Sequence, residues 1–353
     1  MIDPATIEID AGTRAAVIDG VLSRLRAAYV FPAVAERMEE EVRRRMKAGD
    51  YDTVTTASSL CDILTAHLWD IGHDKHLRVF YSREPRTVHP VRADAIPDPD
   101  ERERLRRSAA ARNFGVERVE RLAGNIGLLE LRVFVSPELP GAGATAVAAM
   151  TVLAHTDALI VDLRRNEGGS PAMIALISSY LFDRRTHLND LYWREGDRTE
   201  QFWTHHVPGL QGPGDPHKPV YVLTSKDTFS GGEEFAYNLK ALQRATLIGE
   251  TTAGGAHPGR SHMVTAHVGV VIPAGRAINP ITGTNWEGTG VEPDVEAARD
   301  DALRVAHVTA LRTVIGKAED GSGASSSGVV AEARVALAEL ASWLPWGWRD
   351  SEA

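Results

Sequence analysis

The sequence predicts an α/β fold in which a layered core follows an N-terminal helical subdomain. From residue 158 onward, short apolar runs alternate with helical segments, which is typical of a sheet whose strands are buried on both faces. In residues 12–69, by contrast, apolar residues recur at helical spacing. These two observations place helices first and the α/β core after them.

Composition and charge exclude several classes of protein. The 353 residues carry a net charge of −9, and no basic stripe with interleaved aromatic residues is present, so we expect no nucleic-acid partner. No apolar run has the length of a membrane span, and the first residues lack the regions of a signal peptide. The single cysteine, Cys61, allows no disulfide within the chain. We therefore expect a cytoplasmic protein without a membrane partner.

The N-terminal subdomain is predicted to cover residues 1–75. Residues 12–47 form two helices, which are separated at Tyr29–Pro32 because Pro32 disfavours helix at the residue before it. A third helix is expected over 55–69. Residues 76–113 then supply a strand at 77–81 and a polar loop with a short helix.

The core is predicted to cover residues 114–316. It opens with strands 116–122 and 126–131, which are joined by the turn residues Gly124-Asn125. The elements expected after this hairpin are helix 143–155, strand 158–163, helix 171–182, strand 219–224, helix 233–243, strand 246–249, strand 262–272 and helix 300–315. A Gly/Ser linker, a helix over 329–342 and a Trp-rich tail make up residues 317–353.

Ser230 lies on a strand-to-helix turn and is followed by Gly231 and Gly232. The N–H groups and the positive dipole end of a helix start suit a developing negative charge, and glycine lets the backbone come close to it. Such a serine is either the nucleophile of an elbow, although the G-x-S-x-G pattern is absent, or a helix N-cap. These residues alone leave both interpretations open.

A second strand-to-helix turn, Asn166–Gly169, offers further glycine N–H groups. If the two turns meet at the ends of neighbouring strands, these groups can form an oxyanion hole. The alternative is a tight turn that simply needs glycine.

A serine nucleophile also needs a base, which is usually histidine. The chain has 13 histidines, of which His73 and His76 precede a strand, His257 lies in a Gly-rich loop, and His205-His206 lie in a Trp-rich stretch. Without an H-E-x-x-H motif or a cysteine pair, His73 and His76 do not predict a metal site. We expect neither a metal nor a cofactor.

Several stretches together resemble the tail-specific, or C-terminal processing, serine peptidases. They are DLRRNEGG at 162–169, the segment 224–259 and NWEGTGVEPDV at 285–295. YVFP at 29–32 and GHDKHLRV at 72–79 fit the branch that contains interphotoreceptor retinoid-binding protein repeats and the tricorn protease core. The resemblance covers most of residues 15–300, and it implies a ClpP/crotonase-like core with an extra helical N-terminal subdomain.

The resemblance implies a role for each residue of the two turns. Ser230 matches the nucleophile, and the N–H of Gly231 matches one oxyanion donor. Either Gly168 or Gly169 matches the other donor. The bacterial tail-specific enzymes use a downstream lysine as base, but the matching position here is Gly255.

The tricorn-like branch instead uses an upstream histidine and a downstream glutamate, which His76 and Glu287 match. Tricorn has a serine just before its histidine, where this chain has Lys75. We therefore expect His76 to be the general base and Glu287 to orient or polarise the site, with His257 as the reserve base.

These matches predict a serine peptidase that acts on unfolded chains or small peptides. Residues 82–112 are too few for the PDZ domain of the tail-specific enzymes. One alternative is a binding protein for apolar ligands, with the aromatic stretch 192–206 lining a pocket, although we expect this stretch to form a surface loop or a lid. Another is an acyl-transfer or cyclising enzyme that uses the same acyl-enzyme. The sequence makes no prediction about the oligomeric state.

Overall fold

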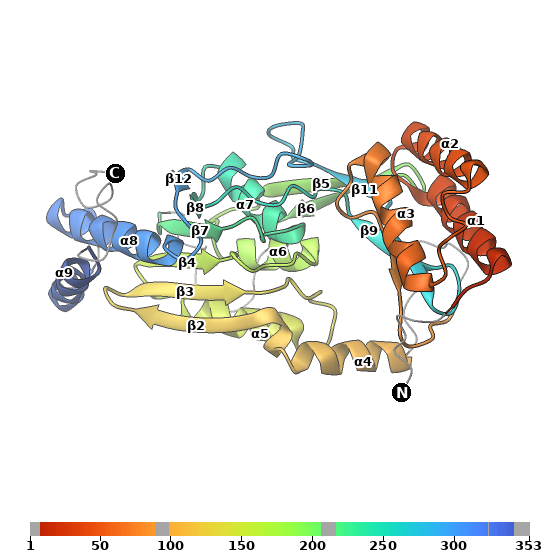
Figure 1. Ribbon diagram of the computed structural model, residues 1–353. Coiled ribbons are helices and arrows are strands. Elements are labelled where there is room, and N and C mark those ends of the chain that lie inside the picture. Colours follow the sequence, from red (N-terminus) through yellow and green to blue (C-terminus); the bar gives the residue numbers. More distant parts are fainter. Residues whose placement is uncertain (1–7, 89–98, 206–216, 324, 342–353) are drawn as a thin grey trace. The chain divides into compact units, whose positions relative to one another are not determined.

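The computed structural model describes residues 8–88, 99–205, 217–323 and 325–341 (Figure 1). The described chain divides into two compact units. The first unit combines residues 8–88 with 190–200 and 255–278, and the second contains the others. Neither unit is continuous in sequence, because the chain passes between them within strands β5 (His187–Trp193) and β6 (Arg198–Trp203). The linear boundaries given above stay a prediction.

The first unit packs helices on a small antiparallel sheet. The helices are α1 (Ala11–Ala28), α2 (Pro32–Ala48) and α3 (Ala57–Gly72). The sheet has the order β1-β10-β9, with β1 at Arg78–Tyr81, β10 at Val268–Pro273 and β9 at Gly259–Met263. These bounds confirm the predicted helical subdomain and its break at Pro32, whose fixed φ suits the first turn of a helix.

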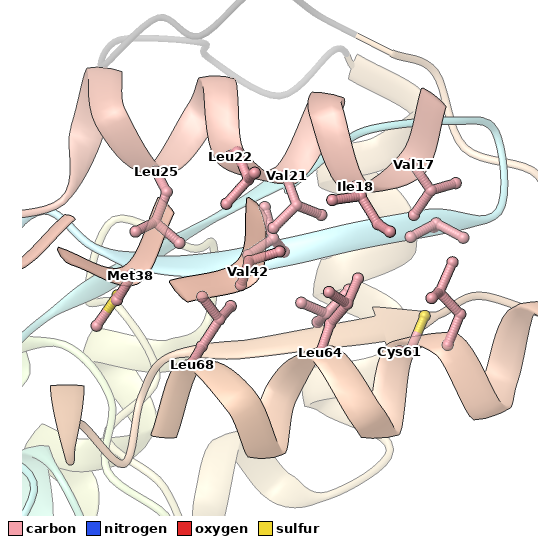
Figure 2. Close-up of a cluster of buried hydrophobic side chains, with 14 of the residues drawn as sticks. Val17, Ile18, Val21, Leu22, Leu25, Met38, Val42, Cys61, Leu64 and Leu68 are labelled. Carbon is pink, nitrogen blue, oxygen red and sulfur yellow. The ribbon is translucent and has the colours of Figure 1, made fainter. Parts of the chain in front are cut away.

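One apolar cluster holds this unit together (Figure 2). Apolar residues of α1, among them Leu22 and Leu25, lie against α2 and α3, which contribute Met38 and Leu68. The cluster continues into the sheet through Val270 of β10. The helical spacing of the apolar residues is therefore what buries all three helices.

The second unit contains a six-stranded sheet of order β12-β8-β7-β4-β3-β2. Its strands are β2 (Val116–Leu122), β3 (Ile126–Leu131), β4 (Ala158–Asp162), β7 (Val220–Thr224), β8 (Thr246–Gly249) and β12 (Val295–Glu296). All neighbours are parallel except β2 and β3. The strand order follows the chain, so crossovers of the usual right-handed sense step in the same direction and put their helices on one face.

The helices of these crossovers are α5 (Ala142–Val152), α6 (Pro171–Ser178) and α7 (Gly231–Ala241). On the other face, α8 (Ala302–Glu319) buries Val305 and Leu311 against the sheet, and α9 (Ser327–Ala341) packs on α8. The predicted layered α/β core is confirmed.

The expectation for residues 262–272 is wrong, because they do not form one strand. β9 and β10 form a hairpin whose turn is closed by the hydroxyl of Thr265, which accepts the N–H groups of His267 and Val268. Apolar residues alternate loosely through this turn, so the sequence pattern does not reveal it.

Residues 192–203 were expected in a surface loop or lid, but most of them belong to strands β5 and β6, which a turn at 194–197 joins. β5 also pairs with a strand that was not predicted, β11 (Gly275–Ile278). β6 is largely exposed, so it carries no apolar alternation. The short helix expected within 84–112 is confirmed as α4 (Pro99–Ala110). His206 and the Trp-rich tail lie outside the described residues. None of the described helices is long and apolar enough to cross a membrane.

Leu68→Ala tests the cluster of the first unit. Leu68 is fully buried, so its truncation leaves a cavity and should lower the free energy of unfolding by about 2–5 kcal/mol, measured by urea unfolding followed by circular dichroism. Asp62→Ala, at an exposed position of the same helix, should change it by less than about 0.5 kcal/mol. Equal effects of the two substitutions would contradict this packing.

Candidate active site

Two turns meet at the carboxyl edge of the second unit's sheet. Strands β4 and β7 are parallel neighbours, with Asp162 opposite Leu223, so the turns that follow them leave the same edge. Three hydrogen bonds join these turns: Phe229 N–H to Asn166 O (3.0 Å), Thr228 Oγ1–H to Leu163 O (2.8 Å) and Ser225 Oγ–H to Arg164 O (2.6 Å). The two turns therefore form one assembly.

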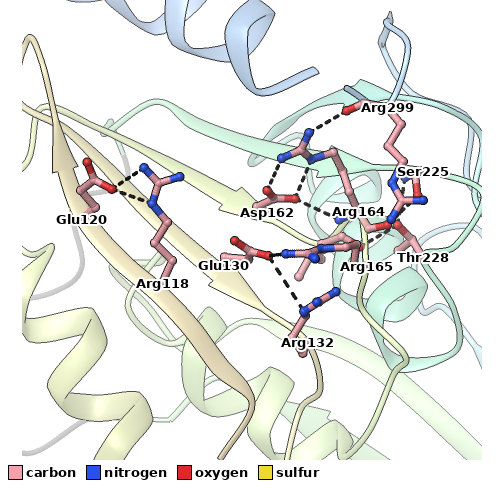
Figure 3. Close-up of polar contacts among 11 residues, drawn as sticks. Arg118, Glu120, Glu130, Arg132, Asp162, Arg164, Arg165, Ser225, Thr228 and Arg299 are labelled. Carbon is pink, nitrogen blue, oxygen red and sulfur yellow. Dashed lines mark hydrogen bonds and ion pairs between the residues drawn. The ribbon is translucent and has the colours of Figure 1, made fainter. Parts of the chain in front are cut away.

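An arginine network supports this edge from the side (Figure 3). Arg164 forms two hydrogen bonds with the buried Asp162, at 2.6 and 2.9 Å, and donates to Arg299 O at 2.6 Å. Glu130 of β3 pairs with Arg165. These bonds fix the backbone where β4 becomes the turn.

Ser230 has a backbone conformation that serine rarely adopts, with φ of 54° and ψ of −117°. An ordinary N-cap residue has extended dihedral angles, so Ser230 departs from the usual cap conformation, although it forms a capping box with Glu233 at the start of α7. A strained strand-to-helix turn is the geometry of a nucleophile elbow. The unusual φ therefore distinguishes Ser230 from an ordinary N-cap residue.

Glu233 holds this strained turn in place. Its side chain is fully buried and accepts the N–H of Ser230 at 2.9 Å, the hydroxyl of Thr252 at 2.6 Å and the N–H of Gly254 at 2.5 Å. The Glu233 carboxylate thus links the serine turn to the loop after β8 through hydrogen bonds. We did not single out Glu233 from the sequence, although S-x-x-E at a helix start is the signature of a capping box.

The glycines of the two turns approach so closely that no side chain fits. A Cβ on Gly168 would lie 2.7 Å from the Cβ of Ser230, and a Cβ on Gly231 would lie 2.9 Å from the nitrogen of Gly169. The structure thus brings together Ser230 and the three glycines that the sequence indicated.

The hydrogen bonds of Asn166 distinguish between Gly168 and Gly169, the two candidate oxyanion donors of the Asn166–Gly169 turn. Asn166 is fully buried, its Nδ2 donates to Leu131 O at 3.0 Å, and its Oδ1 accepts the N–H of Gly168 at 2.9 Å. Within the described part of the chain, the N–H groups of Gly169 and Gly231 donate to no other residue. Gly169, rather than Gly168, therefore has the N–H available for a ligand.

In the first unit, one carboxylate positions two histidines. Asp74 is buried, and its Oδ2 contacts Nδ1 of His257 at 2.8 Å and accepts the hydroxyl of Tyr29 at 3.2 Å. Its Oδ1 accepts the backbone N–H of His76 at 3.0 Å. The edge of Phe31 packs on the ring of His257, with the ring centroids 5.3 Å apart. Asp74 could not be assigned a role from the sequence, because its partner His257 is remote in the chain.

Burial lowers the pKa of His76 to about 4, and this effect exceeds that of Asp74, which raises the pKa. His257 and Arg78 lower the pKa of His76 further. The imidazole of His76 is therefore neutral near pH 7 and has the form that can accept a proton.

Glu287 belongs to the second unit, in the loop that follows β11. Its N–H donates to Asn285 Oδ1 at 2.9 Å, and the next residue, Gly288, donates its N–H to Gly254 O at 3.2 Å. This loop therefore contacts the same Gly-rich segment that Glu233 holds.

Two comparisons of the sequence with family models each match a part of the chain. Residues 125–297 match the model for peptidase family S41, and residues 11–114 match the N-terminal domain of S41 peptidases in eukaryotic IRBP. The chain belongs to peptidase family S41. This confirms the resemblance drawn from the sequence motifs, and family membership supports a peptidase in general terms.

Solved structures share the fold of this S41 chain at low sequence identity. A lipoprotein from Streptococcus agalactiae is similar with a TM-score of 0.57 at 15% identity, over 85% of this chain and 96% of its own. A candidate peptidase from Parabacteroides merdae gives 0.56 at 16%, over 84% and 96%. The tricorn protease gives 0.50 at 17%, over 82% of this chain and 35% of its own, so the S41 chain spans about a third of it.

A buried carboxyl group lies behind the serine turn of the S41 chain. Glu234 follows Glu233 on α7, and burial raises its pKa to about 7, although hydrogen bonds to Asn189 and Asn238 act in the opposite direction. A folded-state pKa above the ordinary value of 4.5 gives stability that is present below pH 4.5 and is lost as the pH rises through 7.

Glu234→Gln tests this titration. The wild type should lose stability between pH 4.5 and 8, on the order of 3 kcal/mol, whereas the variant should lose much less, because glutamine does not ionise. Urea unfolding across this pH range measures the difference, and Glu138→Gln at an exposed position serves as the control. Identical pH profiles of the wild type and Glu234→Gln would contradict the raised pKa.

Proposed function

We propose that this S41 chain is a serine peptidase that cleaves unfolded chains or small peptides through an acyl-enzyme on Ser230. The observation that carries the proposal is the strained φ of 54° at Ser230, at the point where two glycine turns meet. Strain of this kind costs on the order of 1–3 kcal/mol and persists where the surrounding structure enforces it. Here the buried carboxylate of Glu233 and the hydrogen bonds of Asn166 supply that enforcement.

The oxyanion of the tetrahedral intermediate would be bound by two backbone N–H groups. We assign these to Gly231, directly after the nucleophile, and to Gly169, since Gly168 donates to Asn166. Each such donor typically contributes on the order of 100–1,000-fold in rate. The role of Gly168 is then to permit the close approach of the turns.

His76 is the proposed general base. It takes the proton of the Ser230 hydroxyl as Oγ attacks the carbonyl carbon, and it returns the proton to the leaving amine. Water then attacks the acyl-enzyme with the help of the same imidazole. Glu287 orients or polarises the site, as the resemblance to the tricorn-like branch implies. The neutral form of His76 near pH 7 supports this assignment.

His257 is the second candidate base. Its Nδ1 contacts the buried carboxylate of Asp74 at 2.8 Å, which repeats the carboxylate–imidazole pair of a catalytic triad. A carboxylate in this position fixes the ring orientation and stabilises the imidazolium. The two histidines share Asp74, so their separate substitution decides which one accepts the proton.

The apolar-ligand alternative gains no support from the aromatic stretch. Trp193 is contacted by the guanidinium groups of Arg198 and Arg260, and Trp203 by that of Arg185. These rings therefore carry cations on their faces and do not offer an apolar lining.

Ser230→Ala tests the nucleophile. The wild type should react with a fluorophosphonate probe and hydrolyse unstructured peptides, and the variant should lose both properties, because the attacking oxygen is gone. Peptide mapping by mass spectrometry identifies the labelled residue, and Ser261→Ala at an exposed position is the matched control. Labelling that persists in Ser230→Ala would reject the assignment.

His76→Gln and His257→Gln test the base. With His76 as base, its loss should reduce kcat/KM by at least about 100-fold, and the acid limb of the wild-type pH profile should lie near pH 4, below the ordinary value of 6.5. His257→Gln should retain more activity. Circular dichroism should show that both variants are equally folded. If His257→Gln then lowers kcat/KM more than His76→Gln does, the base is His257 instead.

A further inference from the structure

Strand β2 is an edge strand of the six-stranded sheet in the second unit (Figure 1). Among the described residues it pairs with β3 alone, so the other side of its backbone directs N–H and C=O groups away from the sheet. Three of its charged residues, Glu117, Arg118 and Arg121, are exposed. An edge of this kind is a template to which another strand can pair.

The charges of β2 suit a second copy of the same strand. Val119 stands between Arg118 and Glu120. When two copies pair antiparallel with Val119 opposite Val119, the Arg118 of each copy lies opposite the Glu120 of the other. Side chains directly opposite each other lie on one face of the sheet, with Cβ atoms about 4.5–5.5 Å apart. Both contacts therefore join opposite charges.

The neighbouring registers bring like charges together. Because side chains alternate between the two faces of a sheet, the register of two identical antiparallel strands changes in steps of two residues. One step in one direction puts Arg118 opposite Arg118, and one step in the other direction puts Glu120 opposite Glu120. Like charges directly opposite each other are destabilising. Charged edge residues commonly prevent pairing, but here they favour a single register.

Arg118 and Glu120 are already oriented for this contact. Their side chains lie on the same side of β2, where Arg118 Nε donates to Glu120 Oε2 at 2.6 Å (Figure 3). Each side chain keeps 43% of its surface exposed. A guanidinium has five N–H donors and a carboxylate has two acceptor oxygens, so each can bind a second partner. A second copy would extend the pair into a ring of four alternating charges.

Helix α9 adds apolar surface beside this edge. Its Glu332 accepts Nη2 of Arg121 at 2.7 Å, and Val335, one helical turn later, is 61% exposed. The pairing of β2 with β3 is irregular between Val116 and Arg118, so the regular part of the strand is short. The surface is therefore suited to a weak, reversible dimer rather than to an obligate one.

We propose that two copies of this chain form a dimer in which β2 pairs with β2 and the two six-stranded sheets become continuous. Because the two β2 strands are antiparallel, the carboxyl edges of the two sheets point in opposite directions. Each copy then has its serine turn at its own end of the joined sheet. The inference uses residues of the second unit only, and it does not depend on the proposed peptidase function.

Sedimentation velocity of the full chain, from about 1 µM to 1 mM, tests the association. The wild type should change from monomer to dimer with a Kd of roughly 1–100 µM, because the paired segment is short. A wild type that stays monomeric over this whole range overturns the inference.

Charge reversal tests whether β2 is the interface. Arg118→Glu brings carboxylates opposite each other at both contacts, so it should raise Kd at least roughly 10-fold. Arg118→Glu/Glu120→Arg exchanges the two charges and should restore the wild-type Kd. Arg104→Glu makes the same change at an exposed position of α4 and should leave Kd unaltered. A Kd that Arg118→Glu does not change would mean that the dimer uses another surface, and it overturns the inference.

Val119→Cys tests the register. In the proposed dimer this residue faces its own copy, so mild oxidation should give a disulfide-linked dimer on a non-reducing gel. Glu117→Cys is the control, because residue 117 lies opposite residue 121 and therefore about 14 Å along the strands from its own copy, beyond disulfide reach. The native Cys61 is buried. Cross-linking of Glu117→Cys that equals or exceeds that of Val119→Cys overturns the proposed pairing.

Discussion

The contact between the two strand-to-helix turns is the constraint on which the site depends. Asn166 is at its centre, because its amide holds β3 and the N–H of Gly168, while its backbone oxygen accepts the N–H of Phe229. Glycine is required where the turns touch, and Glu233 maintains the strained dihedral angles of Ser230. The sheet supplies two adjacent parallel strand ends, and buried polar bonds convert them into one rigid assembly.

Buried carboxylates recur as organising groups in both units. Glu233 joins the serine turn to the loop after β8, and Asp74 holds His257 and the backbone of His76. A buried carboxylate that accepts several donors is stable only if those donors stay in place. Each carboxylate therefore fixes the groups around it.

Much of the fold could be predicted from the sequence, because its main elements bury continuous or periodic apolar residues. β2, β3 and β8 have the predicted bounds, and α1 and α2 break at Pro32 as expected. The exposed strand β6 was missed because it carries no apolar alternation, and the hairpin of β9 and β10 was missed because loose apolar alternation continues across the turn that Thr265 closes. At the site, glycines and serine were predictable from local turns, whereas Asp74 was not, since its bond to His257 spans 183 residues.

The central claim is that Ser230 is a nucleophile whose oxyanion is held by the N–H groups of Gly169 and Gly231. A crystal structure of the chain reacted with a phosphonate tests it most directly. The account predicts a covalent bond from Ser230 Oγ to phosphorus, with a phosphoryl oxygen within about 3 Å of both N–H groups. An adduct on another residue, or an oxygen directed away from the two glycines, would contradict it.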